Sequence, residues 1–116
     1  GQTVCSGGSD ETVRLWNGAT GAPSQIMRGH DDKVYAVALN VDASLVYSGS
    51  KDKAIREWDA MSGECLRTLL GHTDLVFSVC VSADGKYLYS GSADKTVGVW
   101  DLKENSRAGI ICCGHV

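Results

Sequence analysis

The chain has 116 residues, of which 43% are hydrophobic and 22% charged, and its formal net charge is −3. This length and composition are those of one small globular domain and exclude a disordered chain. The weak negative charge argues against nucleic acid as a partner, because phosphate binding needs a basic patch. No apolar stretch reaches the roughly 18 residues of a membrane span, so we expect no membrane partner either.

Five cysteines make a poor disulfide framework, because their number is odd and two of them are adjacent. We interpret them as free thiols in a reducing compartment. Free thiols predict an intracellular protein, for which we favour the cytoplasm over the nucleus. Near the end of the chain, Cys112, Cys113 and His115 match no zinc-binding spacing. We therefore expect neither a metal site nor another cofactor.

Short strands are expected along the whole chain. The nearly continuous apolar runs Val34–Leu39 and Val76–Val81 predict strands that are buried on both faces. Their Val, Tyr and Phe residues favour strands over helices, and turn residues such as Asp42 and Asp84 close each run. The other strands that the pattern predicts are, in chain order, 22–27, 45–48, 54–58, 65–70, 87–90, 96–100 and 107–113.

The sequence repeats itself with a period of 42 residues. A Gly-His pair at residues 29–30 returns at 71–72, and again at 114–115 after one inserted residue. A fixed period of this length is typical of proteins whose units cannot bury their own apolar faces and therefore stack on one another. The other residues that recur at this step are Ser6, Ser48 and Ser90; Gly7, Gly49 and Gly91; Asp10, Asp52 and Asp94; and Trp16, Trp58 and Trp100.

The pattern resembles the Trp-Asp (WD) repeat family. That family combines a Gly-His pair, a Ser-Gly-Ser-x-Asp turn and a Trp-Asp pair in about 40–45 residues. The turn stands at residues 48–52 and 90–94, and the first unit has a blurred copy at 6–10. The resemblance covers the whole chain and about two and three-quarter repeats. It implies an all-β fold, a segment of a WD-repeat β-propeller built from four-stranded antiparallel blades.

The predicted units are about 1–29, 30–71 and 72–114, all parts of a single β-propeller domain. Gly1 aligns with Ala43 and Val116 aligns with Thr73, so the first unit is expected to lack its inner strand. Because propellers typically have four to eight blades, we expect this chain to be part of a longer one that supplies the remaining blades.

Histidine, serine, aspartate and tryptophan recur together as sets. The combination invites interpretation as a hydrolase triad. Repetition in every unit argues against a single active site, and the chain has no Gly-x-Ser-x-Gly elbow. The sets are His30, Ser48, Asp52 and Trp58; His72, Ser90, Asp94 and Trp100; and Ser6, Asp10 and Trp16, whose histidine would precede Gly1.

A structural role explains these sets, because buried histidine, aspartate and indole groups all need hydrogen-bond partners. The resemblance to WD repeats implies such a hydrogen-bonded tetrad in each unit. We favour Ser48 and Ser90 as its hydroxyl members over Ser50 and Ser92.

Partner binding is expected at the loops before the inner strand and after the second strand, where WD-repeat proteins often bind peptides. Aromatic residues there are typical interface anchors, and lysines could steer an acidic peptide. Packing between blades is the competing interpretation of the aromatic rings. The residues at these places are Lys33, Tyr35, Lys51, Leu75, Phe77 and Ala93.

Glu57 departs from the pattern, because its counterparts are Leu15 and Val99. We expect it either to be exposed at an edge or to pair with a cation such as Arg14 or Arg56.

The function predicted from these features is that of a non-catalytic scaffold that binds partner proteins or peptides through the propeller surface. An alternative is a substrate-recognition or regulatory subunit of a larger enzyme assembly, such as a ubiquitin ligase or a signalling complex. Nothing in the sequence indicates an enzyme in its own right, and a fold alone does not decide function.

Overall fold

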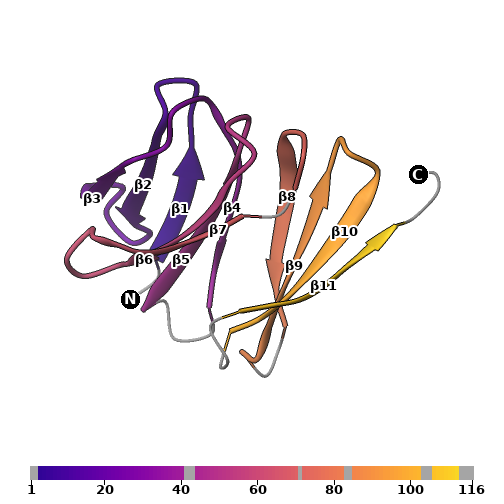
Figure 1. Cartoon of the computed structure of the whole chain (residues 1–116). Coiled ribbons are helices and arrows are strands. Elements are labelled where there is room, and N and C mark those ends of the chain that lie inside the picture. The colour runs from indigo at the N-terminus through magenta and orange to yellow at the C-terminus, as the bar shows by residue number, and fades with distance from the viewer. Residues whose placement is uncertain (1–2, 41–43, 71, 83–84, 103–105, 113–116) are drawn as a thin grey trace.

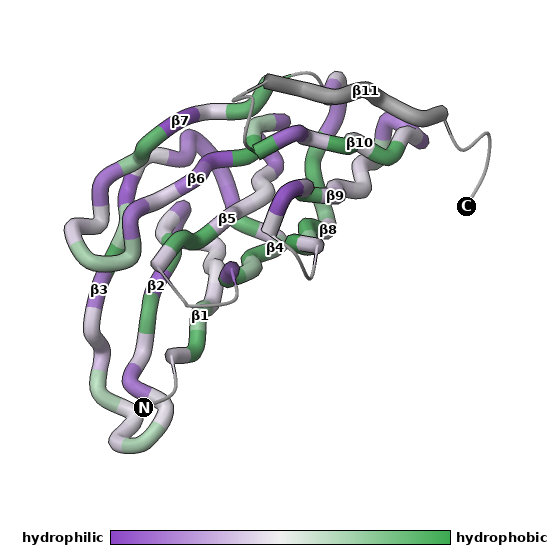
Figure 2. The backbone as a smooth tube through the Cα atoms, turned by 90° about the horizontal axis from the view of Figure 1, so that it is seen from below, coloured by the Kyte–Doolittle hydropathy of each residue, from purple (hydrophilic) through white to green (hydrophobic). Residues whose placement is uncertain are grey.

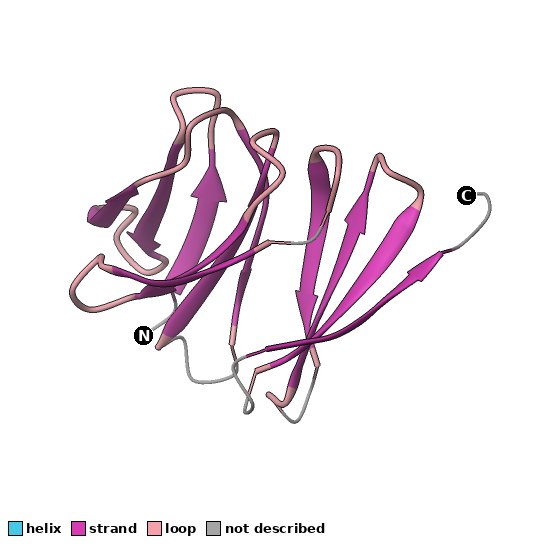
Figure 3. Cartoon of the chain, viewed as in Figure 1, coloured by secondary structure: helices cyan, strands magenta, loops and turns pink. Residues whose placement is uncertain are grey.

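A computed structural model describes residues 3–40, 44–70, 72–82 and 85–102, and the backbone of 106–112. In this part of the chain every regular element is a strand (Figure 3). The strands are β1 (Thr3–Gly7), β2 (Thr12–Asn17), β3 (Pro23–Arg28), β4 (Val34–Leu39), β5 (Leu45–Ser50), β6 (Ile55–Asp59), β7 (Cys65–Leu69), β8 (Val76–Val81), β9 (Tyr87–Ser92), β10 (Thr96–Asp101) and β11 (Ser106–Cys112).

The strands form three antiparallel sheets that stand side by side (Figure 1). Blade 1 is β1-β2-β3, blade 2 is β4-β5-β6-β7, and blade 3 is β8-β9-β10-β11. The all-β propeller segment predicted from the sequence is confirmed. The apolar strands β4 and β8 have the predicted bounds, and β5 and β9 extend two residues further than predicted. Asp42, Gly71, Asp84, Cys113 and the Gly114-His115 pair lie outside the described residues, as do the side chains of 106–112.

Three equivalent tight turns join β1 to β2, β5 to β6 and β9 to β10. Each contains a non-glycine residue with a left-handed backbone: Glu11, Lys53 and Lys95 have φ values of 72°, 73° and 70°. In blade 2 the turn is closed by Lys53 N–H donating to Ser50 O at 3.2 Å. Non-glycine residues rarely have positive φ, and its recurrence at the 42-residue step shows that the repeat extends to backbone conformation.

The apolar core lies between blades. Figure 2 shows the apolar strands β4 and β8 side by side. At the first interface, Val13, Leu15 and Met27 of blade 1 pack against Val34, Val46 and Trp58 of blade 2. At the second interface, Tyr47, Ile55 and Leu69 of blade 2 pack against Val76, Leu88 and Trp100 of blade 3. Stacking therefore buries the faces that single blades would expose.

Small residues let adjacent blades approach closely. A Cβ atom on Gly49 would lie 2.6 Å from Cγ1 of Val76 in blade 3, and one on Gly7 would lie 2.5 Å from Cγ1 of Val34 in blade 2. These separations are far below van der Waals contact. The glycine of the Ser-Gly-Ser turn is thus required where the next inner strand packs.

Glu57 is only 6% exposed and lies in the interface between blades 2 and 3. Its carboxylate accepts hydrogen bonds from Arg67 Nε at 2.9 Å and Nη2 at 3.0 Å, and from the Tyr47 hydroxyl at 2.5 Å. The expectation of an exposed position was wrong, and the expectation of pairing with a cation is confirmed, but the cation is Arg67 and neither Arg14 nor Arg56. Arg14 instead forms an ion pair with Asp10.

The register of blade 2 explains this pairing. Glu57 lies directly opposite Tyr47 on β5 and directly opposite Arg67 on β7, and opposed side chains on one face of a sheet contact each other. We call Tyr47, Glu57 and Arg67 the polar row. Burial, reinforced by the Glu57 carboxylate, raises the pKa of Tyr47. Arg67 Nη2 also donates to Leu102 O at 3.1 Å, so the row binds blade 3.

The first unit supplies a matched test of the polar row, because Leu15 and Gln25 occupy the places of Glu57 and Arg67. Arg67→Gln should lower the free energy of unfolding by about 3–5 kcal/mol, since it leaves a buried carboxylate without its cation. Adding Glu57→Leu should restore at least half of that loss. Urea denaturation of both variants measures the effect. A double variant as unstable as the single one would contradict a paired role for these residues.

Candidate functional site

The four side chains of each predicted tetrad form a continuous hydrogen-bonded chain in blades 2 and 3. In blade 2, Trp58 Nε1 donates to Ser48 Oγ at 2.8 Å, and Ser48 Oγ lies 2.5 Å from His30 Nε2. His30 Nδ1 lies 2.9 Å from Asp52 Oδ2. A carboxylate only accepts, so Nδ1 carries the proton and Nε2 of the neutral ring accepts from the serine hydroxyl.

Blade 3 repeats this geometry. Trp100 Nε1 donates to Ser90 Oγ at 2.9 Å, Ser90 Oγ lies 2.7 Å from His72 Nε2, and His72 Nδ1 lies 2.9 Å from Asp94 Oδ2. Thr96 adds a hydroxyl that donates to Asp94 and lies 3.2 Å from His72 Nδ1.

The aspartates connect each tetrad to the loop that enters its blade. Asp52 Oδ2 accepts from the backbone N–H of Asp31 at 2.9 Å, and Oδ1 accepts from Ala54 N–H at 2.9 Å. Asp94 accepts equivalently from Thr73 and Thr96. Each tetrad therefore ties the loop before the inner strand to the second strand, the third strand and the turn between them.

Burial decides what these sets can do chemically. The Ser48 residue is 0% exposed and Ser90 is 2% exposed, and each hydroxyl oxygen already accepts an indole N–H. A substrate carbonyl cannot reach either oxygen, although the Ser-His-Asp order resembles that of a hydrolase. The geometry suits a structural tie that satisfies buried polar groups.

The electrostatics agree with a neutral ring and an ionised carboxylate. Burial lowers the pKa of His30, although Asp52 acts in the opposite direction. Burial alone would raise the pKa of Asp52, but hydrogen bonds from Asp31 N–H, His30 and Ala54 N–H lower it overall. Hydrogen bonds from Thr96, Thr73 N–H and His72 likewise outweigh burial and lower the pKa of Asp94.

Blade 1 contains only part of such a set. Trp16 Nε1 donates to Ser6 Oγ at 3.0 Å. Asp10 is exposed, and it accepts from Thr12 Oγ1 at 2.7 Å and from Arg14 Nη2 at 2.9 Å. Those hydrogen bonds hold the pKa of Asp10 at about 2. The structure thus brings Ser6 and Trp16 together, while Asp10 bonds within its own hairpin.

Ser50 and Ser92, the second serines of the Ser-Gly-Ser turns, do not take part in the tetrads and bond to the backbone instead. Ser50 Oγ donates to Lys33 O at 2.7 Å and accepts from Asp52 N–H at 3.1 Å. Ser92 makes the equivalent bonds to Leu75 O at 2.8 Å and from Asp94 N–H at 3.1 Å. They hold the turn against the loop before the inner strand.

Tyr35 and Phe77 are 47% and 46% exposed. Each lies where the register shifts between the first two strands of its blade, between Val34 and Ala36 in one case and between Val76 and Ser78 in the other. A β-bulge re-aims a side chain, and here it leaves both aromatic residues outside the buried clusters between blades.

The other predicted binding residues gather beside these rings. Lys51 N–H donates to Lys33 O at 2.9 Å, and Ala93 N–H donates to Leu75 O at 3.0 Å. Lys33, Lys51 and Ala93 are exposed, and Leu75 is half-buried. The structure therefore places one trio at the same end of each blade: Lys33, Tyr35 and Lys51 in blade 2, and Leu75, Phe77 and Ala93 in blade 3. We call these six residues the loop surface.

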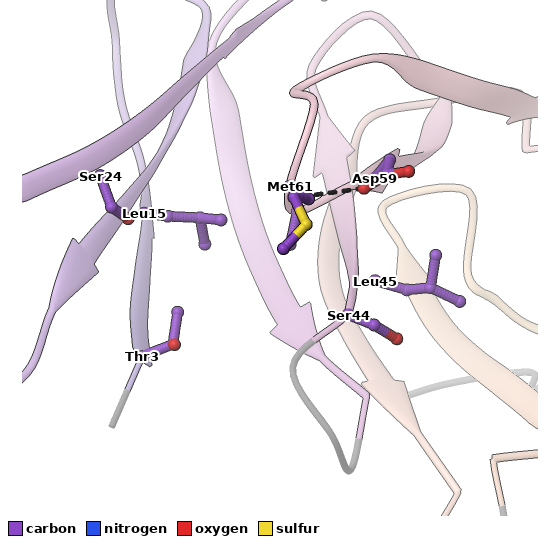
Figure 4. Close-up of a pocket in the computed structure, with 8 residues that line it drawn as sticks. Thr3, Leu15, Ser24, Ser44, Leu45, Asp59 and Met61 are labelled. Carbon is purple, nitrogen blue, oxygen red and sulfur yellow. Dashed lines mark hydrogen bonds between the residues drawn. The ribbon is translucent and has the colours of Figure 1, made fainter. Parts of the chain in front are cut away.

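A hollow of about 550 Å³, which the sequence did not predict, lies between blades 1 and 2 at the other end of the strands. The side chains of Leu15 and Met61 extend toward one another across it (Figure 4). Its lining consists of Thr3, Leu15, Ser24, Ser44, Leu45, Asp59, Ala60 and Met61. A signal was present in the sequence, because Ala60 takes the place of Leu102 in the next unit.

In the part of the chain that the structure describes, no helix has the length and apolar content of a membrane span. Within the same residues, no three His, Cys, Asp or Glu side chains gather in a way that could hold a metal ion. Cys112, Cys113 and His115 lie outside this comparison, because their side chains are not described.

A model of the WD domain, G-beta repeat, matches residues 1–17, 21–59 and 63–101. The chain belongs to the WD40 repeat family. Each matched stretch ends at the Trp-Asp pair, or at Trp16-Asn17 in the first unit. A search of the curated proteins found no match to the chain. WD40 repeats generally serve as protein–protein interaction scaffolds and are typically non-catalytic.

Removing one tetrad member should destabilise the WD40 fold. Asp52→Ala leaves the buried His30 Nδ1 and the N–H groups of Asp31 and Ala54 without their acceptor, so the free energy of unfolding should fall by about 1–3 kcal/mol. Asp10→Ala is the matched control at the equivalent exposed position and should cost less. Thermal and urea unfolding measure both. Equal losses in the two variants would contradict the structural role of the tetrad.

The lowered pKa of His30 gives stability a pH dependence. The unfolded chain protonates this ring at its ordinary pKa of about 6.5, and the folded chain does so at lower pH. As pH falls below about 6.5, the unfolded state therefore binds more protons and the free energy of unfolding decreases. Asp52 and Asp94 should add a further decrease below about pH 4, where unfolded carboxyl groups protonate first.

Urea denaturation between pH 8 and pH 5 tests the histidine part of this dependence. A His30→Gln variant should lose its share of the slope over that range. A stability that rises on acidification through this range would overturn the assignment of a neutral, buried ring.

Proposed function

We propose that the chain is part of an intracellular protein–protein interaction scaffold that binds its partner through the loop surface. The observation that carries this proposal is the pair of half-exposed aromatic residues on equivalent bulges of blades 2 and 3. An aromatic ring contributes a large contact area and loses little side-chain entropy on binding, and such residues dominate binding energy at interfaces.

The charges around the rings favour an acidic partner segment. Lys33 and Lys51 are exposed and are joined by a backbone hydrogen bond, so two cations lie at the end of β4 that carries Tyr35. Two nearby carboxylates keep their charge but are directed to the backbone of their own loops: Asp32 Oδ1 accepts from Lys33 N–H at 2.8 Å, and Asp74 Oδ1 accepts from Leu75 N–H at 2.7 Å. Lysines at the rim increase the rate of association more than the final affinity.

The remaining blades of the propeller come, in this proposal, from the rest of the parent chain. The intracellular location agrees with the free thiols of Cys5, Cys65 and Cys80. The non-catalytic part of the proposal draws support from the buried serine hydroxyls of the tetrads.

Substitution of the two aromatic residues tests the loop surface. In the parent protein, Tyr35→Ala and Phe77→Ala should each weaken partner binding by more than about 1 kcal/mol, roughly a fivefold rise in Kd. Leu66→Ala, which removes a half-exposed apolar residue from the outer strand β7, is the control. Partners captured by the wild-type protein are identified first, and their affinities for each variant are then measured by calorimetry.

The folding of each variant is checked by thermal unfolding. Loss of binding in both aromatic variants with unchanged melting supports the loop surface. Unchanged affinity with a large drop in melting temperature would show that the rings are packing residues and that the partner binds elsewhere.

A further inference from the structure

The hollow between blades 1 and 2 belongs to neither the tetrads nor the loop surface. Ser44 and Lys51 flank opposite ends of β5, so the hollow and the loop surface lie at opposite ends of the blades. Its volume of about 550 Å³ is within the usual range of about 300–1,000 Å³ for ligand-binding clefts.

The hollow exists because small residues replace large ones at this interface. Four of its lining residues have bulkier counterparts 42 residues later, at the interface between blades 2 and 3, where the equivalent space is occupied by the polar row and Leu102. The pairs are Thr3 and Leu45, Ser24 and Leu66, Ser44 and Lys86, and Ala60 and Leu102. The hollow is therefore particular to the interface between blades 1 and 2, and the packing of WD40 blades does not in itself require it.

The lining combines an apolar wall with a single charge. Leu15, Leu45, Ala60 and Met61 supply the apolar surface. Met61 is 90% exposed, and its flexible thioether can adapt to a bound group. Three hydroxyl-bearing residues complete the lining: Thr3, Ser24 and Ser44.

Asp59 is the only lining residue with an acidic or basic side chain. Its Oδ1 accepts from the backbone N–H groups of Met61 at 2.9 Å and Ser62 at 3.4 Å. No residue in the described part of the chain donates a hydrogen bond to Oδ2. The carboxylate is thus held in place by its turn and retains one oxygen for a ligand.

We propose that this hollow binds a lysine or arginine side chain of a partner protein. The aliphatic stem would lie against Leu45 and Met61, and the cationic head would pair with Asp59 Oδ2. Long basic side chains combine an apolar stem with a charged end, which matches an apolar wall with one carboxylate. The net charge of −3 also favours approach of a basic segment. This site is independent of the loop surface, which is proposed to bind acidic segments.

The repeat provides two matched variants. Asp59→Asn removes the charge and keeps the turn, because Asn17 Oδ1 accepts from Ala19 N–H at 2.9 Å and Thr20 N–H at 3.2 Å in the equivalent turn of blade 1. Ala60→Leu introduces the residue found at position 102 and fills the hollow without adding charge.

Met61 and Met27 make a direct readout available. With ¹³C-labelled methionine methyl groups, Met61 reports on the hollow, and Met27, which is fully buried in the adjacent core, reports on the fold. The probe is a capped alanine pentapeptide with lysine at its centre. The comparison peptides carry norleucine or glutamate at the same place, and each is added up to millimolar concentration.

The lysine peptide should shift the Met61 signal saturably and bind about three- to fivefold more tightly than the norleucine peptide, the usual range for a partly exposed ion pair. Asp59→Asn should abolish this preference, and Ala60→Leu should abolish the binding of both peptides. Tyr35→Ala should leave both unchanged, which separates this proposal from the loop surface.

Three results would overturn the proposal: no saturable shift of Met61 with the lysine peptide, equal or better binding of the norleucine or glutamate peptide, or unchanged lysine binding in Ala60→Leu. An unaltered Met27 signal in each variant shows that the core between blades 1 and 2 is intact.

Discussion

The buried indole N–H groups of Trp58 and Trp100 require acceptors, and the rest of each WD40 blade is arranged around the residue that provides one. Trp58 and Trp100 are almost completely buried between blades, where an unpaired donor would be costly. The acceptor is a serine on the neighbouring strand, and that serine needs a histidine as its own acceptor. The histidine needs an aspartate in turn, so one buried donor leads to a chain of four side chains that ends at a turn.

Apolar stacking and polar pairing both stabilise the contacts between blades. Apolar clusters are buried at both interfaces, and glycines permit close approach of the next inner strand. The two interfaces nevertheless differ. The polar row joins blade 2 to blade 3 through Leu102 O, whereas the equivalent place between blades 1 and 2 is partly hollow. The two junctions therefore differ in detail, although each retains an apolar core.

The features predictable from the sequence are those that the 42-residue period repeats. The bounds of β4 and β8 follow from apolar runs, and the pairing of Ser48 with Trp58 follows from recurrence in a known motif. A cation partner for Glu57 could be predicted, but its identity could not, because strand register places Arg67 opposite Glu57 and spacing alone does not reveal register. The hollow was missed because it depends on the volumes of residues from five strands and two connecting segments and on their packing across an interface.

The position of the tetrad histidine, on the connection between two blades, has a mechanical consequence. His30 follows β3 of blade 1 directly, yet it is bonded to Ser48 and Asp52 of blade 2. A tensile load applied along the connection between the two blades would therefore reach the second and third strands of blade 2 through side chains before it reached β4. The connection is anchored in the interior of the blade that follows it. Under force, the connection and the interior of blade 2 should therefore unfold together, because the hydrogen bonds of His30 join them directly.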